Sequence, residues 1–90
     1  MGYAQDYHDF AMLIQVSPGR DAEWHQILKA AKPEEGVCVE IRSPNLVIFA
    51  CSADTEMDAI EQAEQWLSSL ATRANPPISL TFHARTSGVI

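Results

Sequence analysis

The stretch VCVEIRSPNLVIFACS, residues Val37–Ser52, decides the predicted fold, because it joins two strand patterns through one turn. Its first half, Val37–Arg42, alternates apolar and polar residues with period two, which is typical of an edge strand with one buried face. Its second half, Leu46–Ser52, is apolar throughout, which favours a central strand. The Ser-Pro-Asn between the halves predicts the turn of a β-hairpin.

The proline of this turn limits the register of the hairpin. Pro44 cannot take a positive φ, so we expect a four-residue loop, Ser43–Leu46, with the proline at its second position. A three-residue loop would shift the pairing by one residue and would separate the two cysteines of the chain. In the expected register the opposed pairs are Cys38 with Cys51, Glu40 with Phe49, and Arg42 with Val47.

Direct opposition would place the Cα atoms of Cys38 and Cys51 roughly 4.5–5.5 Å apart, within the range of a disulfide. We nevertheless expect both to be reduced, small and partly buried apolar residues, because the chain shows no export signal. A functional disulfide and a metal site are the alternatives. Two cysteines are too few for a closed zinc site, and the candidate third ligand, His83, is predicted on the far edge strand.

The rest of the chain supplies two further strands and two amphipathic helices. Asp9–Val16 is an apolar run that follows a polar arm at residues 1–8, and Ile78–Arg85 alternates cleanly before a tail at residues 86–90. Residues 19–32 and 53–74 repeat apolar residues with helical spacing, and Asp54 or Thr55 suits the N-cap of the second helix. The expected buried stripes are Trp24, Ile27, Leu28 and Ala31 in the first helix, and Met57, Ile60, Ala63, Leu67 and Leu70 in the second.

These elements follow one another in the order βαββαβ, which predicts a single α+β domain over residues 1–90 with ferredoxin-like topology. Right-handed crossovers place both helices on one face of a four-stranded antiparallel sheet, whose strands, numbered along the chain, lie in the order 4-1-3-2. This topology requires strands 1 and 3 to be central, and these are the two runs that are apolar on both faces.

One face of such a sheet carries no helix, and the expected register gives it an apolar middle. A monomer with this face bare would expose a hydrophobic patch. A symmetric homodimer with its sheets face to face would cover the patch, and the alternatives are cover by residues 1–8 or 86–90, or a different protein partner. The predicted interface residues are Leu13, Val47, Phe49 and Cys51.

Composition and charge exclude several classes of function. The chain has 90 residues, a net charge of −6 and only six lysines and arginines, which disfavours a nucleic-acid partner. No apolar run approaches the roughly 20 residues that span a membrane. The N-terminal residues lack the basic start and apolar core of a signal peptide. We therefore expect a cytoplasmic protein, and no motif indicates a cofactor or a metal.

Four cationic or titratable side chains are the candidate ligand-binding residues. Arg20 follows Ser-Pro-Gly at the start of the first helix, where free backbone N–H groups can hold a small anion such as phosphate. His83 and Arg85 lie on the polar side of the last strand, where a histidine can titrate near neutral pH. Arg42 ends the first strand of the hairpin.

The first strand, the Pro18-Gly19 dipeptide and the amphipathic helix that follows, in a chain of this length, resemble the dimeric α+β barrel families. The resemblance implies a small-molecule enzyme with polar residues in a cavity between helices and sheet, but here that face is almost wholly apolar. We therefore expect a non-enzymatic domain that self-associates or binds a protein partner through the open sheet face. The alternative is a small-molecule-binding protein or cofactor-independent enzyme that uses His83, Arg85 and Arg42.

Overall fold

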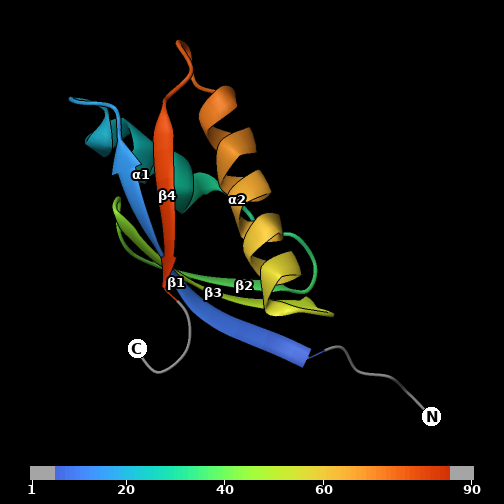
Figure 1. Ribbon diagram of the computed structural model, residues 1–90. Helices are drawn as coiled ribbons and strands as arrows, with labels where there is room; N and C mark the ends of the chain where they lie inside the picture. Colours follow the sequence, from blue (N-terminus) through green and yellow to red (C-terminus); the bar gives the residue numbers. More distant parts are fainter. Residues whose placement is uncertain (1–5, 86–90) are drawn as a thin grey trace.

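The computed structural model describes residues 6–85, which form four strands and two helices (Figure 1). In chain order the elements are β1 (Asp6–Val16), α1 (Asp21–Ala30), β2 (Val37–Ser43), β3 (Leu46–Ala53), α2 (Glu56–Thr72) and β4 (Leu80–Arg85). The predicted βαββαβ order is therefore confirmed for the described residues.

The four strands form one antiparallel sheet in the order β2-β3-β1-β4. Read from the other edge, this is the predicted order 4-1-3-2, with β1 and β3 in the centre. The buried side chains of both helices join a single core with one face of the sheet. We call the opposite face the open face, and it carries Tyr7, Asp9, Ala11, Leu13, Gln15, Cys38, Glu40, Ser43, Leu46, Ile48, Ala50, Ser52, Thr81, His83 and Arg85.

The core lies between the two helices and the sheet, and aromatic side chains contribute much of it. Phe10 of β1 stacks on Phe49 of β3 with 5.6 Å between ring centroids. Phe49 also meets Trp66 of α2 edge to face at 6.0 Å, and Trp24 of α1 is fully buried. Such aromatic pairs each add roughly 0.5–1.5 kcal/mol to the stabilisation from apolar burial. Phe49 therefore links both central strands to α2.

The β2–β3 hairpin contains an irregularity that the sequence pattern does not reveal. Ser43 pairs with Leu46 across the turn, as the expected loop requires. The next pair, however, is Ile41 with Val47, so that Arg42 is an extra residue in β2. A β-bulge of this kind shifts every pairing beyond it by one position.

The shift overturns the predicted register and, with it, the predicted orientation of β3. Cys38 lies opposite Ala50, so its predicted pairing with Cys51 is wrong. Side chains alternate between the two faces of a strand, and a one-residue shift therefore exchanges the faces. Val47, Phe49 and Cys51 consequently point into the core, not onto the open face.

Both helices are shorter than the apolar pattern predicts, and α2 buries a different stripe. The N-cap prediction is confirmed, because the Thr55 hydroxyl accepts a hydrogen bond from the backbone N–H of Asp58 at 3.1 Å. Met57 in the first turn is 71% exposed, so its predicted burial is wrong. The buried residues of α2 are Ala59, Ala63, Leu67, Leu70 and Ala71.

The ends of β1 and β4 also differ from prediction. β1 begins at Asp6, so Tyr7 and His8 belong to the sheet and not to an arm. The extension forms because β3 continues to Ala53, which pairs with Asp6. The Nε2 atom of His8 lies 3.1 Å from the Ala53 carbonyl oxygen. β4 begins later than predicted. The rest of the predicted arm, residues 1–5, and the tail at 86–90 lie outside the described residues.

Candidate functional site on the open sheet face

Strand pairing arranges the open face into rows of directly opposed residues that cross all four strands. One row, which we call the charged row, runs from β2 to β4 through Glu40, Ile48, Ala11 and Arg85. Its two central members are apolar, and its two ends carry opposite charges. The next row consists of Ser43, Leu46, Leu13 and His83.

The middle of the open face is apolar, and its larger side chains are partly exposed in the single chain. Leu13, Leu46 and Ile48 are half-buried, whereas Val47 and Phe49 on the other face are fully buried. We call this group the apolar centre, and its members are Ala11, Leu13, Leu46, Ile48 and Ala50. The exposed side chains around it are Tyr7, Asp9, Gln15, Cys38, Glu40, Thr81, His83 and Arg85.

Only one of the four predicted interface residues, Leu13, lies on the open face. The other three, which are 0% exposed beneath the helices, are Val47, Phe49 and Cys51. Their predicted exposure is wrong because the bulge at Arg42 exchanges the faces of β3. For the same reason Leu46 and Ile48 are absent from the predicted interface. The alternative register, shifted by one residue, places both of them on this face.

The two cysteines lie on opposite faces of the hairpin. Cys38 is exposed on the open face, and Cys51 is fully buried under the helices. Burial raises the pKa of the Cys51 thiol to about 11, and the charge of the Cys38 thiolate adds a smaller increase. Because their Cβ atoms point away from each other, the two residues do not have the geometry of an intrachain disulfide. Both are free thiols.

The four predicted ligand-binding residues do not come together. Arg42 lies at the β2 edge, where its Nε donates to the Glu40 carboxylate at 2.5 Å. His83 and Arg85 lie on β4 at the other edge, with β3 and β1 between. Arg20 lies in the loop before α1. The structure therefore gives these four side chains no common site.

His83 lies beside a shallow hollow of about 340 Å³. The hollow is lined by Leu13, Ile14, Gln15, Asn45, Thr81, Phe82 and His83. No carboxylate or second base is among these described residues, and the Asn45 amide already donates to the Ile14 carbonyl at 2.9 Å. The hollow thus offers one histidine beside uncharged polar groups, without a partner for acid–base catalysis.

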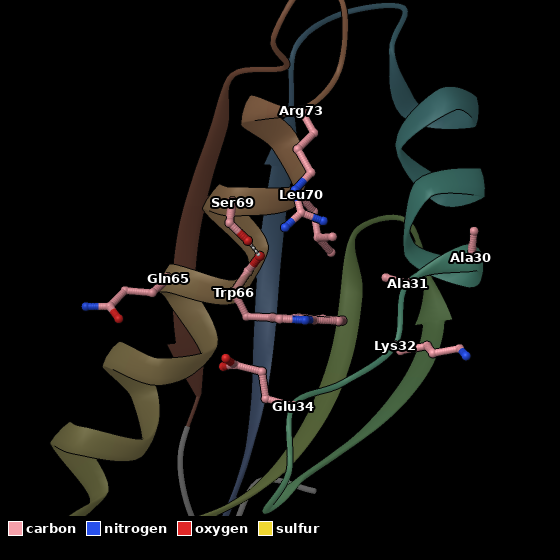
Figure 2. A pocket seen from close by; sticks show the side chains of 9 residues that line it. All are labelled: Ala30, Ala31, Lys32, Glu34, Gln65, Trp66, Ser69, Leu70 and Arg73. Carbon is pink, nitrogen blue, oxygen red and sulfur yellow. Dashed lines mark hydrogen bonds between the residues drawn. The ribbon is translucent and has the colours of Figure 1, made fainter.

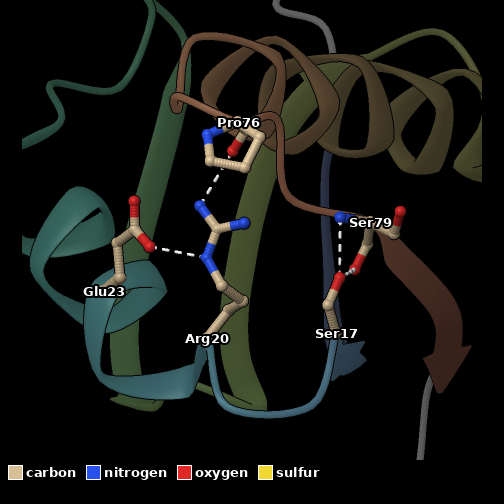
Figure 3. A network of polar contacts seen from close by, with 5 residues as sticks. All are labelled: Ser17, Arg20, Glu23, Pro76 and Ser79. Carbon is tan, nitrogen blue, oxygen red and sulfur yellow. Dashed lines mark hydrogen bonds and ion pairs between the residues drawn. The ribbon is translucent and has the colours of Figure 1, made fainter.

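Arg20 ties the loop after β1 to the loop before β4 (Figure 3). Its Nε donates to the Glu23 carboxylate at 2.6 Å, and its Nη2 donates to the Pro76 carbonyl at 2.8 Å. The hydrogen bond between the side chains raises the pKa of Arg20 and lowers the pKa of Glu23. Ser17 and Ser79 join the same loops through three more hydrogen bonds. The guanidinium is engaged within the chain, which does not favour the predicted anion site.

A second hollow, of about 460 Å³, lies between the end of α1 and the C-terminal half of α2 (Figure 2). The Trp66 indole extends from α2 toward Ala31, and the charged side chains around it are Lys32, Glu34 and Arg73. Lys32, Glu34 and Arg73 are all exposed, so none of these charged side chains is held in a desolvated position to bind a ligand here. Charges of both signs at its border indicate no particular ligand.

Among the described residues, no group of three or more histidine, cysteine, aspartate or glutamate side chains is placed to hold a metal ion. The same part of the chain contains no helix that is long and apolar enough to cross a membrane.

No known protein family, curated protein or solved structure matches this sequence.

Proposed function

We propose that this chain is a non-enzymatic domain of ferredoxin-like topology that associates with protein through its open face, as a homodimer or with a different partner. One observation carries the proposal: within residues 6–85 no helix lies over the apolar centre, which is bordered by exposed polar and charged side chains. Protein interfaces commonly combine an apolar core with a polar rim in this way.

The small size of the domain also supports association. A chain of 90 residues buries only about 60–65% of its unfolded surface, which leaves little stability to spare. Covering Leu13, Leu46 and Ile48 with a second chain adds roughly 25 cal/mol for each Å² of apolar surface removed from water. A two-fold dimer is the simplest cover, because one self-complementary patch then serves both chains.

The thiols support a location in the cytoplasm. Cys38 is an exposed free thiol, and such thiols persist in a reducing compartment, whereas oxidising compartments favour disulfides. We therefore include a cytoplasmic location in the proposal.

A small-molecule enzyme is the alternative function, and the hollow beside His83 is the observation that bears on it. General acid–base catalysis requires a histidine within hydrogen-bond reach of the substrate, usually together with a second positioned group. Arg42 lies across the sheet and Arg20 is engaged in its loop. The apolar centre therefore supports association better than the hollow supports catalysis.

The substitution Leu46→Lys tests association through the open face, because it places a charge in the apolar centre and leaves the core intact. Met57→Lys is the matched control, since Met57 is a 71% exposed apolar residue on α2. We expect the wild type and Met57→Lys to form the same associated species in analytical ultracentrifugation, and Leu46→Lys to remain a monomer. Circular dichroism checks that all three proteins are folded. Equal sedimentation of the three would contradict self-association through this face.

A further inference from the structure

The charged row carries opposite charges at its two ends. Glu40 at the β2 end pairs with Arg42, and both side chains stay more than half exposed, at 61% and 54%. Arg85 at the β4 end forms no ion pair with any residue between 6 and 85. A second copy of the row, facing the first in the opposite direction, is complementary to it. Each acidic end then meets a basic end, and the apolar residues in the middle meet each other.

A two-fold axis parallel to the strands stacks this row on its own reversed copy. This axis lies midway between two sheets that face each other, above the boundary between β1 and β3. Rotation about it moves no residue along the strand direction, and it sets β2 over the second copy's β4 and β1 over its β3. Glu40 then faces Arg85 of the partner subunit, and Ile48 faces Ala11 of the partner subunit.

The side chains of the charged row suit the gap in such a dimer. Sheets packed face to face lie about 10 Å apart. In the charged row a large residue, Ile48, meets a small one, Ala11, which lets the two layers interdigitate there. In the adjacent rows Leu46 meets Leu13 of the partner subunit, and Asp9 meets Ala50 of the partner subunit at the end of the apolar centre. At the edges, the long Glu40 and Arg85 side chains extend toward each other across the same gap.

The other aligned arrangement is not complementary. A two-fold axis perpendicular to the strands sets β2 over β2 and β4 over β4. Centred on the charged row, it brings Glu40 to Glu40 and Arg85 to Arg85, and such like-charge contacts are unfavourable. If this axis is moved along the strands so that the charged row faces the next row of the second copy, Arg85 faces His83 of the partner subunit. That pair contains no acidic group either.

We propose that the open face is occupied by a second copy of this chain, related by a two-fold axis parallel to the strands, with reciprocal Glu40–Arg85 contacts at the two edges. This inference rests on the proposed association and adds the identity and the orientation of the partner. Symmetry produces each contact twice per dimer. Each Glu40 carboxylate then lies between Arg42 of its own chain and Arg85 of the partner subunit.

Charge reversal at the two ends of the row tests this orientation. Glu40→Arg and Arg85→Glu each bring like charges together at both edges, so each should raise the dissociation constant of the dimer about tenfold. The double variant Glu40→Arg/Arg85→Glu restores both contacts with the charges exchanged. Its dissociation constant, measured by analytical ultracentrifugation, should return to within about threefold of the wild-type value.

Two exposed residues on the helical side provide matched controls. Glu61→Arg and Arg73→Glu change the net charge by the same amounts as the two test substitutions, but Glu61 lies in α2 and Arg73 is the C-cap residue that follows it. We expect both controls to keep the wild-type dissociation constant. Thermal unfolding followed by circular dichroism checks that every variant is folded.

Weakening in the single variants and rescue in the double variant is the expected result. A dimer that tolerates either single reversal unchanged, or a double variant no tighter than the singles, overturns the orientation. If either of these results is obtained but Leu46→Lys still prevents association, the proposed use of the open face is retained and only the orientation is rejected. A wild-type protein that is monomeric at all concentrations overturns the proposed dimer together with its orientation.

Discussion

Ile48 and Phe49 are neighbours in the chain but lie on opposite faces of the sheet. Phe49 is fully buried against Phe10 and Trp66, whereas Ile48 is half-buried on the open face. Phe49→Ala should therefore lower the free energy of unfolding by about 3–5 kcal/mol, and Ile48→Ala by less than about 2 kcal/mol. Chemical denaturation at a concentration low enough to maintain the monomer measures both values.

If Phe49→Ala does not fold, Phe49→Leu replaces it, because it leaves a smaller cavity. A larger loss of stability for Ile48→Ala than for the Phe49 variant would mean that the two faces of β3 are exchanged, with Ile48 in the core and Phe49 on the open face. That result would restore the register expected from the turn alone and would contradict the bulge at Arg42.

Cys51 makes a second residue-level prediction, for alkaline pH. Its pKa of about 11 in the folded chain lies above the ordinary value of 9.0, so the unfolded chain loses this proton first as pH rises. The stabilising contribution is complete below pH 9.0 and is lost as pH rises through about 11. We expect the free energy of unfolding to fall less steeply over this range in Cys51→Ala than in the wild type.

Cys38→Ala is the control for this pH dependence, because Cys38 is exposed and its removal leaves the buried thiol in place. Denaturant titrations between pH 8 and pH 11 should give Cys38→Ala and the wild type similar slopes with pH. Equal slopes for Cys51→Ala and the wild type would show that the buried thiol does not contribute.

At the scale of elements, the β2–β3 hairpin shows what the sequence pattern contains and what it lacks. The alternation of Val37–Arg42 correctly predicts which side chains of β2 face the core, since polar and apolar residues differ clearly. Leu46–Ser52 is apolar on both sides, so nothing in its pattern distinguishes its faces. The orientation of β3 then depended on the register alone, and the extra residue Arg42 changed that register.

Helix α2 shows a related limit. Its predicted stripe favours large residues such as Met57, but three of its five buried residues are alanines: Ala59, Ala63 and Ala71. Short side chains let a helix approach the sheet closely, and their small size makes them weak signals in an apolar pattern. The N-cap was predictable, because Thr55 is followed by acidic residues suited to a first helical turn.

The cap makes a prediction of its own. Thr55→Ala removes the acceptor for the Asp58 N–H and should lower the free energy of unfolding by about 1 kcal/mol. Thr72→Ala is the control at the other end of α2, because Thr72 is exposed and alanine favours the helix there. Thermal unfolding compares the two, and equal stability of both variants would contradict a role for the cap.

At the scale of the whole molecule, the strand order was predictable because it follows from coarse features. Strands that are apolar on both faces belong in the centre, and right-handed crossovers fix the rest. Glu40 and Arg85 were correctly placed at the two rims, since edge strands alternate clearly. The apolar centre was predicted to exist but was assigned the wrong residues of β3, because only the bulge decides between them.

The solution mass of the wild-type chain tests the proposed association most directly. Light scattering coupled to size exclusion, over a range of concentrations with and without reductant, measures it. We expect a species of twice the 9.9 kDa of the single chain, unaffected by reductant, because no cysteine takes part in the proposed contacts. A mass of 9.9 kDa at every concentration, or a dimer that reductant dissociates, would contradict self-association through the open face.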